Sequence, residues 1–130
     1  MKLLVDTHIW LWMLTAPERM NEAARNAIAN PANEVILSVA SAWEVAIKHA
    51  LGKLPLHAPP ARLVEISVTM LGVNVLPIAL DHALAAAALP QHHRDPFDRM
   101  LVAQAQLDGL TLVTADDVLR QYGGTLLWAA

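Results

Sequence analysis

Short runs of mainly aliphatic residues alternate along the chain with longer segments that carry helix signals, and this alternation limits the fold more than any other feature. Within the runs, apolar residues follow one another instead of alternating with polar ones, which predicts strands buried on both faces. Strands of this kind, each followed by a helix, are typical of a parallel sheet covered by helices on both sides. The expected strands are residues 3–5, 35–37, 73–76, 110–114 and 126–128.

Helix start and stop residues divide the remaining segments. Thr7 is expected to cap a helix to about residue 14, and Pro17 to open a helix that reaches about residue 29. Ser38 is expected to cap a helix that ends near Gly52. Further helices are expected over 61–71, 81–89, 96–108 and 116–122, with a proline-rich loop at 54–60. The length suits a single α/β domain over residues 1–130.

The composition favours a partner and restricts the chemistry. Charged residues make up 16% of the chain, against about 25% in typical domains, and 55% of residues are hydrophobic. Some apolar surface should therefore remain exposed, which predicts a homo-oligomer, a protein partner or both. Cysteine is absent, so a bound metal must use oxygen or imidazole ligands. The net charge of −3 argues against binding nucleic acid through a general basic excess.

The amino-terminal apolar run is short, because Asp6 interrupts it. A secretory signal would need roughly 7–15 apolar residues in a row. No later run approaches the ~18 residues that a membrane-spanning helix needs. We therefore expect a soluble, cytoplasmic protein without a membrane partner.

Two acidic residues follow expected strands. Asp6 comes directly after the first strand, and Asp116 comes two residues after Thr114, the end of the fourth. In open α/β sheets ligands bind beyond the carboxyl ends of the strands, so both carboxylates should lie at one edge of the sheet. Asp117 is better explained as an acid in the first turn of a helix.

Glu44 belongs to a helix sector that is otherwise apolar, formed with Ala40, Ile47 and Leu51. A carboxylate on that side needs a partner. One alternative is an ordinary ion pair with Lys48, four residues later in the helix. The other alternative is a role in a site, and the local pattern leaves both open.

The segment R-D-P-F-D-R at 94–99 begins the helix expected over 96–108. Asp95 at the N-cap, Pro96 at the first helical position and Asp98 two residues later resemble a capping box, and capping is the favoured reading for Asp95. Asp98 also leads the apolar face of that helix, so capping and ligation are equally open for it. A helix amino end favours negative charge in both cases.

Four acids from distant positions are therefore candidates for one site: Asp6, Glu44, Asp98 and Asp116. Without compensation they would repel one another and raise some of their pKa values. A hard divalent cation such as Mg²⁺ would remove the repulsion and serve phosphoryl chemistry. Four basic residues near these positions could meet a phosphate backbone, although each is more often a solvated side chain: Arg94, Arg99, Lys48 and Lys53.

The pattern as a whole resembles the PIN-domain ribonucleases, specifically the VapC-like toxins of toxin–antitoxin modules. The matching segments are L-L-V-D-T-H at 3–8, S-V-A-S-A-W-E at 38–44, H-R-D-P-F-D-R-M-L-V-A-Q-A at 93–105 and L-V-T-A-D at 112–116. They stand in the family's order and span nearly the whole chain. The resemblance implies a three-layer α/β/α fold with a parallel sheet of four or five strands, and a Mg²⁺- or Mn²⁺-dependent endoribonuclease.

The same resemblance assigns roles to single residues. The family's acidic quartet corresponds to Asp6, Glu44, Asp98 and Asp116, with Asp6 and Asp98 as the principal metal ligands. Thr7 and Thr114 correspond to supporting hydroxyl positions, and the role of Asp95 stays open. The resemblance also implies in-line hydrolysis of RNA, a homodimer and inhibition by a cognate antitoxin. The tryptophans Trp10, Trp12 and Trp43 could form such an interface, although core packing explains at least two of them better.

Three other interpretations compete with a nuclease. The first is a phosphatase with Asp6 as nucleophile, which His8 disfavours because such enzymes carry an acid two residues after the nucleophile. The second is an inactive α/β module that binds a protein or RNA. The third is a transition-metal site made of His92, His93 and Asp95, which is disfavoured because adjacent histidines converge poorly.

Overall fold

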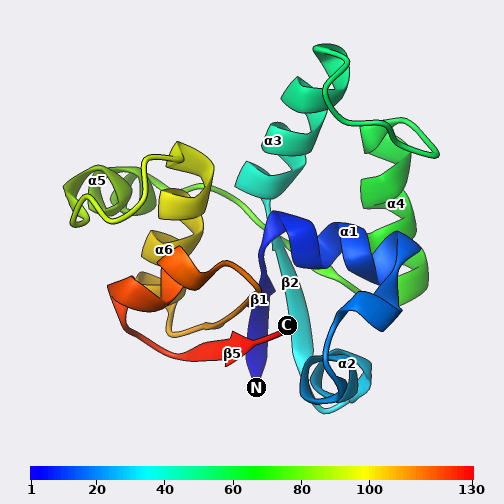
Figure 1. The fold of residues 1–130 in the computed structure, drawn as a ribbon, viewed down its shortest axis with the longest axis horizontal. Coiled ribbons are helices and arrows are strands. Elements are labelled where there is room, and N and C mark those ends of the chain that lie inside the picture. Colours follow the sequence, from blue (N-terminus) through cyan, green and yellow to red (C-terminus); the bar gives the residue numbers. More distant parts are fainter.

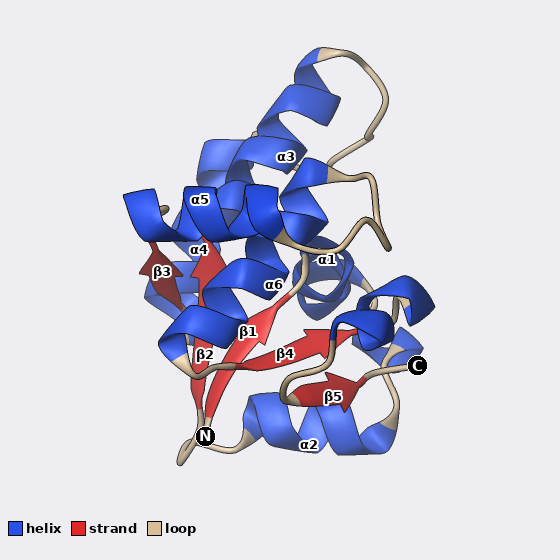
Figure 2. Cartoon of the chain, turned by 90° about the vertical axis from the view of Figure 1, so that its left-hand side faces the viewer, coloured by secondary structure: helices blue, strands red, loops and turns tan.

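The computed structural model describes residues 1–130 and contains one parallel sheet of five strands, in the order β3-β2-β1-β4-β5. Figure 2 shows the strands side by side, with helices around them. The strands are β1 (Lys2–Val5), β2 (Glu34–Ser38), β3 (Asn74–Leu76), β4 (Thr111–Thr114) and β5 (Leu126–Trp128). All four strand pairs are parallel, as the apolar runs predict.

Helices cover both faces of the sheet. Figure 1 shows α5 and α6 on one side and α1, α2 and α4 on the other, with α3 rising above the strand ends. The helices are α1 (Thr7–Thr15), α2 (Glu22–Ala29), α3 (Val39–Ala50), α4 (Pro60–Leu71), α5 (Leu80–Ala88) and α6 (Pro96–Asp108), with short 3₁₀ helices η1 (Pro17–Arg19) and η2 (Asp117–Tyr122). The expected three-layer α/β/α fold is therefore confirmed.

The central strand β1 has no polar face. Leu3 and Val5 pack with α1, α2 and α4 in one core cluster, whereas Leu4 packs in a second cluster with α6. All three side chains are fully buried. Because successive strand residues point to opposite faces, a continuous apolar run is what a strand between two helical layers requires.

The helix expected from Pro17 to residue 29 is divided in two, so that prediction is wrong. The chain forms η1, becomes extended at Met20 and restarts as α2. Asn21 is the N-cap of the restarted helix, and its Oδ1 accepts a hydrogen bond from the Ala24 N–H at 2.9 Å. Its Nδ2 and backbone N–H donate to the carbonyl oxygens of Trp128 and Ala129 at 2.9 and 2.8 Å. Asn21 therefore ties α2 to the carboxyl-terminal strand.

The remaining boundaries differ little from expectation, but the N-cap of α1 is Asp6 and not Thr7, so that capping prediction is wrong. The segment expected as a helix over 116–122 is the 3₁₀ helix η2, with Asp116 as its N-cap. Ser38 caps α3 as predicted, with the Ala40 N–H donating to its hydroxyl oxygen at 3.0 Å. Gly72 and Gly109 end their helices with positive φ angles of 68° and 67°. None of the helices combines the length and the apolar character needed to cross a membrane.

The double role of Asn21 predicts a measurable loss of stability in Asn21→Ala. We expect the free energy of unfolding to fall by about 1–3 kcal/mol, because the variant loses a helix cap and a hydrogen bond to β5. Asn26→Ala is the matched control, since Asn26 is exposed within α2. Urea unfolding followed by circular dichroism measures both variants. Equal stability of Asn21→Ala and the wild type would contradict this account of the helix break.

Candidate active site

Asp6 and Asp116 lie together at the carboxyl ends of β1 and β4, and Thr114 connects them. Asp6 is 3% exposed and caps α1, with its Oδ1 accepting from the Ile9 N–H at 2.8 Å. The Thr114 hydroxyl donates to Asp6 Oδ2 and accepts from the Asp116 N–H at 3.0 Å. One side chain thus contacts the carboxylate of Asp6 and the backbone of Asp116. Neighbouring parallel strands bring residues 108 positions apart into direct contact.

Glu44 approaches the same region from α3. It is 3% exposed, and the Thr7 hydroxyl donates to its Oε1 at 2.7 Å. Lys48 pairs with its Oε2, so the ordinary helix ion pair considered from the sequence is present. This pairing raises the pKa of Lys48, because the hydrogen bond to Glu44 favours the ammonium form. Glu44 is therefore both a member of the acidic group and half of an ion pair.

The first turn of α6 contributes Asp95 and Asp98, which have different environments. Asp95 is the N-cap, and its Oδ1 accepts from the Phe97 N–H at 2.8 Å. Asp98 is mostly buried, and its carboxylate is 3.1 Å from His93 Nε2. The capping role predicted for Asp95 is confirmed, whereas Asp98 points toward the other acids.

The pKa shifts show that these acids interact. Burial, together with the negative charges of Asp95, Glu44 and Asp6, raises the pKa of Asp98 to about 7 against the attraction of His93. Burial also raises the pKa of Asp6, opposed by its hydrogen bonds from Thr114 and Ile9 and supported by the charge of Asp116. The structure thus brings Asp6, Glu44, Asp98 and Asp116 into one group, in which each acid interacts with at least one other.

His93 is a site residue that the sequence analysis did not assign to this group. Its Nε2 lies 3.1 Å from both Asp98 Oδ2 and Asp116 Oδ2, and one potential metal-binding atom from each of the three residues falls within 4.8 Å of the others. His92 is not part of it, because its ring packs against Tyr122 with centroids 5.1 Å apart. In the sequence, His93 stood out only as the first residue of the segment 93–105 and as a member of the disfavoured metal site with His92 and Asp95.

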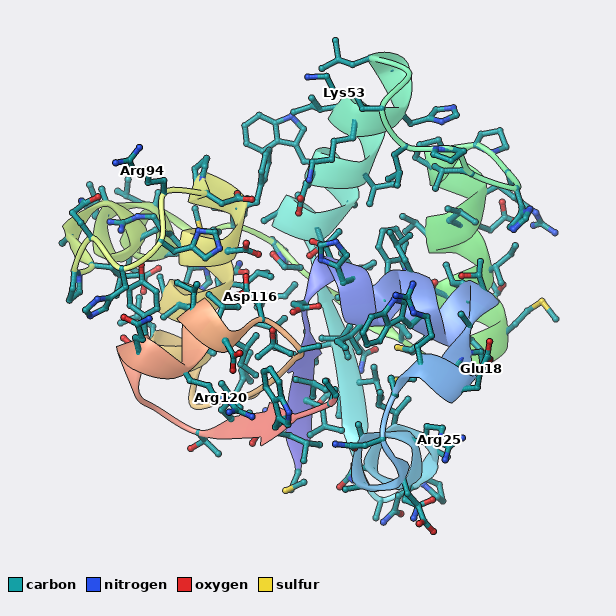
Figure 3. All side chains as sticks on the ribbon, in the orientation of Figure 1. Glu18, Arg25, Lys53, Arg94, Asp116 and Arg120 are labelled. Atoms are coloured by element: carbon teal, nitrogen blue, oxygen red, sulfur yellow. The ribbon has the colours of Figure 1, made fainter.

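The four basic residues named from the sequence have different positions. Arg99 is buried, and its terminal nitrogens donate to five backbone carbonyl groups between residues 86 and 93, so the suggestion that it meets a phosphate is not supported. Arg94 and Lys53 are exposed. Figure 3 shows them projecting from the α5–α6 side and from the far end of α3, with Asp116 below both in this view. Lys48 is held by Glu44.

The tryptophans divide between core and surface. Trp10 is fully buried, and its Nε1–H donates to the Ser67 hydroxyl at 2.9 Å. Trp12 is partly exposed under the Arg19 guanidinium, which lies 4.9 Å from the ring centroid. Trp43 is 57% exposed and packs edge-on against Phe97. Trp10 is therefore a core residue, whereas Trp43 leaves most of its surface free for a partner.

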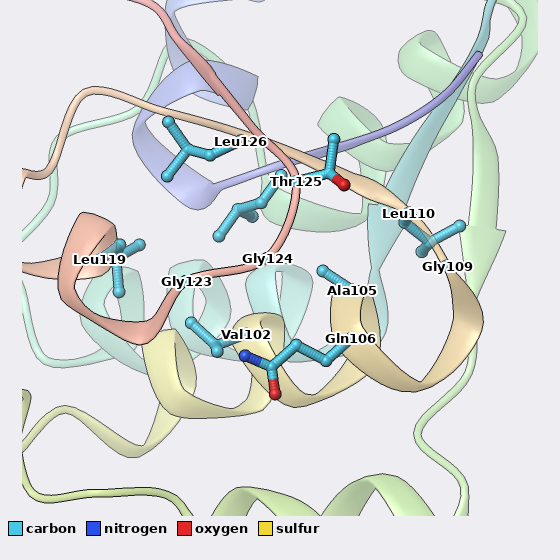
Figure 4. Close-up of a pocket in the computed structure, with 11 residues that line it drawn as sticks. Val102, Ala105, Gln106, Gly109, Leu110, Leu119, Gly123, Gly124, Thr125 and Leu126 are labelled. Atoms are coloured by element: carbon cyan, nitrogen blue, oxygen red, sulfur yellow. The ribbon is translucent and has the colours of Figure 1, made fainter.

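A separate pocket lies away from the acids, under the turn at Gly123 and Gly124. Figure 4 shows that α6, β4 and the start of β5 enclose it. Its lining is mainly aliphatic and includes Leu119 and Leu126, and it contains no ionisable side chain. Such a lining offers no acid, base or ligand, so the acidic group at the strand ends is the better candidate for chemistry.

Comparison with known proteins supports the family suggested by the motifs. Residues 3–124 match the sequence model of the PIN domain. The chain is 31% identical to ribonuclease VapC22 of Mycobacterium tuberculosis over 121 residues, covering 92% of this chain and 90% of VapC22. It is 39% identical to ribonuclease VapC16 of the same organism over 71 residues, a match that spans 55% of this chain and only 48% of VapC16.

Among solved structures, the chain resembles VapBC2 from Rickettsia felis, which was crystallised with a DNA fragment from its promoter. The TM-score is 0.73 with full coverage of both chains, at 12% sequence identity. At this identity the likeness concerns the fold alone. The family-model match over most of the chain and the similarity to VapC22 show the relationship directly, and we conclude that the protein belongs to the PIN-domain family.

Proposed function

We propose that this protein is an endoribonuclease of the VapC type, which hydrolyses RNA phosphodiester bonds with the help of Mg²⁺ or Mn²⁺. The observation that carries the proposal is the group of four carboxylates at the strand ends, where burial and then mutual repulsion raise the pKa of Asp98 to about 7. The two relatives compared above are both named ribonucleases. Burying like charges together is costly unless a cation compensates them.

The available atoms suit a hard divalent cation. Asp98 and Asp116 present oxygens close to one another, and Asp6 is joined to Asp116 through Thr114. All are carboxylate oxygens, which Mg²⁺ and Mn²⁺ prefer. Asp98 is the least satisfied of them, because the single partner found for its carboxylate is His93. We assign Asp6, Asp98 and Asp116 to the cation, with Glu44 at its margin because Thr7 and Lys48 already hold that carboxylate.

When bound there, the cation would stabilise charge on the phosphoryl oxygens and make water a stronger nucleophile. The residues of the chain supply the rest. Thr114 and Thr7 orient the carboxylates, which keeps the site arranged before substrate arrives. Arg94 and Lys53, which are exposed on the α5–α6 side and at the end of α3 (Figure 3), would bind the phosphate backbone of RNA. Such contacts position a nucleic acid without selecting its sequence.

The biological setting follows from the VapC resemblance. We propose that a cognate antitoxin holds the enzyme inactive, that the chain forms a homodimer, and that it acts in the cytoplasm where its RNA substrate is found. Exposed apolar side chains support contacts with partners, above all Trp43, Leu80 and Leu84, which are 57%, 77% and 64% exposed.

A phosphatase with Asp6 as nucleophile is the weaker alternative. A nucleophilic carboxylate oxygen needs free access to phosphorus, yet Asp6 is 3% exposed and each of its oxygens accepts a hydrogen bond. Incubation with a labelled phosphate ester would trap a phosphorylated Asp6 if that mechanism operated. We expect no labelled protein.

Asp6→Asn and Asp98→Asn test the metal site, because each removes a charge and keeps the side-chain shape. We expect each to abolish RNA cleavage. Each should also weaken Mg²⁺ binding by more than the roughly 10–100-fold that loss of an outer-shell partner costs. Glu18→Gln is the control, since Glu18 is exposed and distant from Asp116 (Figure 3). Calorimetric titration and gel assays measure the two effects. Cleavage that persists in either variant, or in excess EDTA, would refute the proposal.

Asp98 should also make the stability of the metal-free protein depend on pH. Its pKa is about 7 in the folded chain against 3.8 for an ordinary aspartate, so the folded state holds this proton more tightly than the unfolded state. The resulting stabilisation is complete below about pH 4 and is lost as the pH rises through about 7. The Tm of the wild type minus the Tm of Asp98→Asn should therefore be smaller at about pH 8 than at about pH 5.

Thermal denaturation in EDTA at both pH values measures this shift, and subtracting Asp98→Asn cancels the other titrating groups. Adding MgCl₂ should restore more stability at the higher pH, because a cation competes with the proton for the same carboxylate. A Tm difference that is independent of pH would contradict the raised pKa.

Asp95 should behave differently from Asp98. Asp95→Ala removes the cap of α6 and should lower the free energy of unfolding by about 0.5–2 kcal/mol, whereas Asp95→Asn keeps a capping oxygen and should cost little. Both variants should retain Mg²⁺-dependent cleavage once folded. Urea unfolding and the cleavage assay make the comparison. If both variants lost Mg²⁺ affinity, Asp95 would be a ligand and not only a cap.

A further inference from the structure

His93 is held by contacts on its backbone as well as on its ring. Its N–H donates to the Tyr122 hydroxyl oxygen at 2.7 Å, and its carbonyl oxygen accepts from Arg99 at 3.3 Å. The buried Arg99 also donates to the carbonyl groups of Leu89 and Pro90 at 3.0 Å each, which fixes the segment before His93. A loop residue anchored in this way has a defined position before any ligand arrives.

The ring of His93 is held in one tautomer. Its Nδ1 lies 3.0 Å from the backbone nitrogen of Asp95, and that nitrogen is always a donor. Nδ1 must therefore present its lone pair to the Asp95 N–H. In the neutral ring the proton then resides on Nε2, the atom that faces Asp98 and Asp116 at 3.1 Å each.

This tautomer argues against His93 as a metal ligand, despite its distance from the two carboxylates. A ligating histidine offers a bare nitrogen to the metal and donates the N–H of its other nitrogen to an acceptor. In His93 the arrangement is reversed, because Nδ1 accepts and Nε2 donates. Binding a cation through Nε2 would place a proton on Nδ1, directly against the Asp95 N–H.

A cation held by Asp98 and Asp116 would compete with His93 for their oxygens. The Nε2–H would then need another acceptor, because an unpaired buried donor is costly. The His93 side chain is 20% exposed, so part of the ring can be reached by a molecule bound at the acidic group. A phosphate oxygen next to the cation is an anionic acceptor of the required kind.

We infer that His93 is a substrate-contacting residue, whose Nε2–H donates a hydrogen bond to a non-bridging oxygen of the RNA phosphate while Asp98 and Asp116 hold the cation. The inference rests on the proposed nuclease function. It adds a neutral donor beside the acids that would hold the cation, and it removes His93 from the set of metal ligands.

Nuclear magnetic resonance tests the tautomer without any cleavage assay. Long-range proton–nitrogen correlation spectra of the ¹⁵N-labelled full chain report which ring nitrogen carries the proton, and His93→Gln identifies the signals of His93. We expect the proton on Nε2 in the metal-free chain and after addition of MgCl₂. A proton that moves to Nδ1 when MgCl₂ is added would show ligation through Nε2 and overturn the inference.

Variants test the contact with substrate. His93→Ala removes the donor, His93→Gln can place an amide N–H near the position of Nε2, and His92→Ala is the matched control because His92 contacts Tyr122 instead of the acids. The probe is a pool of single-stranded RNA oligonucleotides of random sequence with MgCl₂. We expect His93→Ala to slow cleavage about tenfold or more, the value of one hydrogen bond to a charged group. His93→Gln should recover most of the rate, and His92→Ala should stay near wild type.

Mg²⁺ affinity without RNA, measured by calorimetry, separates the possible roles. A donor that competes for the same carboxylate oxygens can be removed without weakening Mg²⁺ binding, so the Kd of His93→Ala should be unchanged or lower. A weaker Mg²⁺ affinity that parallels the slower cleavage would show that His93 serves the metal site, and wild-type cleavage by His93→Ala would show that it serves structure only. Either result overturns the inference, provided that the wild type itself cleaves RNA. A wild type that neither binds Mg²⁺ nor cleaves would instead overturn the nuclease proposal.

Discussion

The side-by-side carboxyl ends of β1 and β4 are the constraint on which the site depends. Asp6 follows the last residue of β1, and its backbone N–H still donates to the Val113 carbonyl of β4 at 3.0 Å. Thr114 completes the connection through hydrogen bonds to Asp6 and Asp116. A register shift of one residue would turn Thr114 toward the opposite face of the sheet and separate the two acids. The apolar layers that hold the register thereby also hold the site.

The four acids are surrounded by groups that partly compensate their negative charge. Lys48 pairs with Glu44, hydroxyl and amide groups support Asp6, and His93 lies between Asp98 and Asp116. These contacts reduce the repulsion without removing it, because the charges of Asp95, Glu44 and Asp6 still add to the effect of burial in raising the pKa of Asp98 to about 7. A fold that stabilises such a group through its apolar core, and leaves the compensating charge to a ligand, is suited to binding a divalent cation.

Arg99 connects the loop that carries His93 to helix α6, which carries Asp98, although Arg99 is not itself one of the site residues. It lies one residue after Asp98 on α6, and its guanidinium donates to the carbonyl groups of Leu89, Pro90 and His93. The loop with the imidazole and the helix with the carboxylate are thus held in a fixed relation. A buried guanidinium that satisfies several carbonyl groups at once is a strong anchor because charge-assisted hydrogen bonds are the stronger class.

The sequence by itself determined the order and type of nearly all elements, and it located the four acids, because both depend on local patterns: apolar runs, capping residues, and acids after strands or on apolar helix sectors. Only the tertiary structure decided the break before Asn21, the burial of Arg99 and the place of His93. In each case the deciding partner lies elsewhere in the fold, in β5 for Asn21, at the end of α5 for Arg99 and after β4 for His93. A hydrogen bond between distant segments leaves no periodic trace in the chain, so packing alone reveals it.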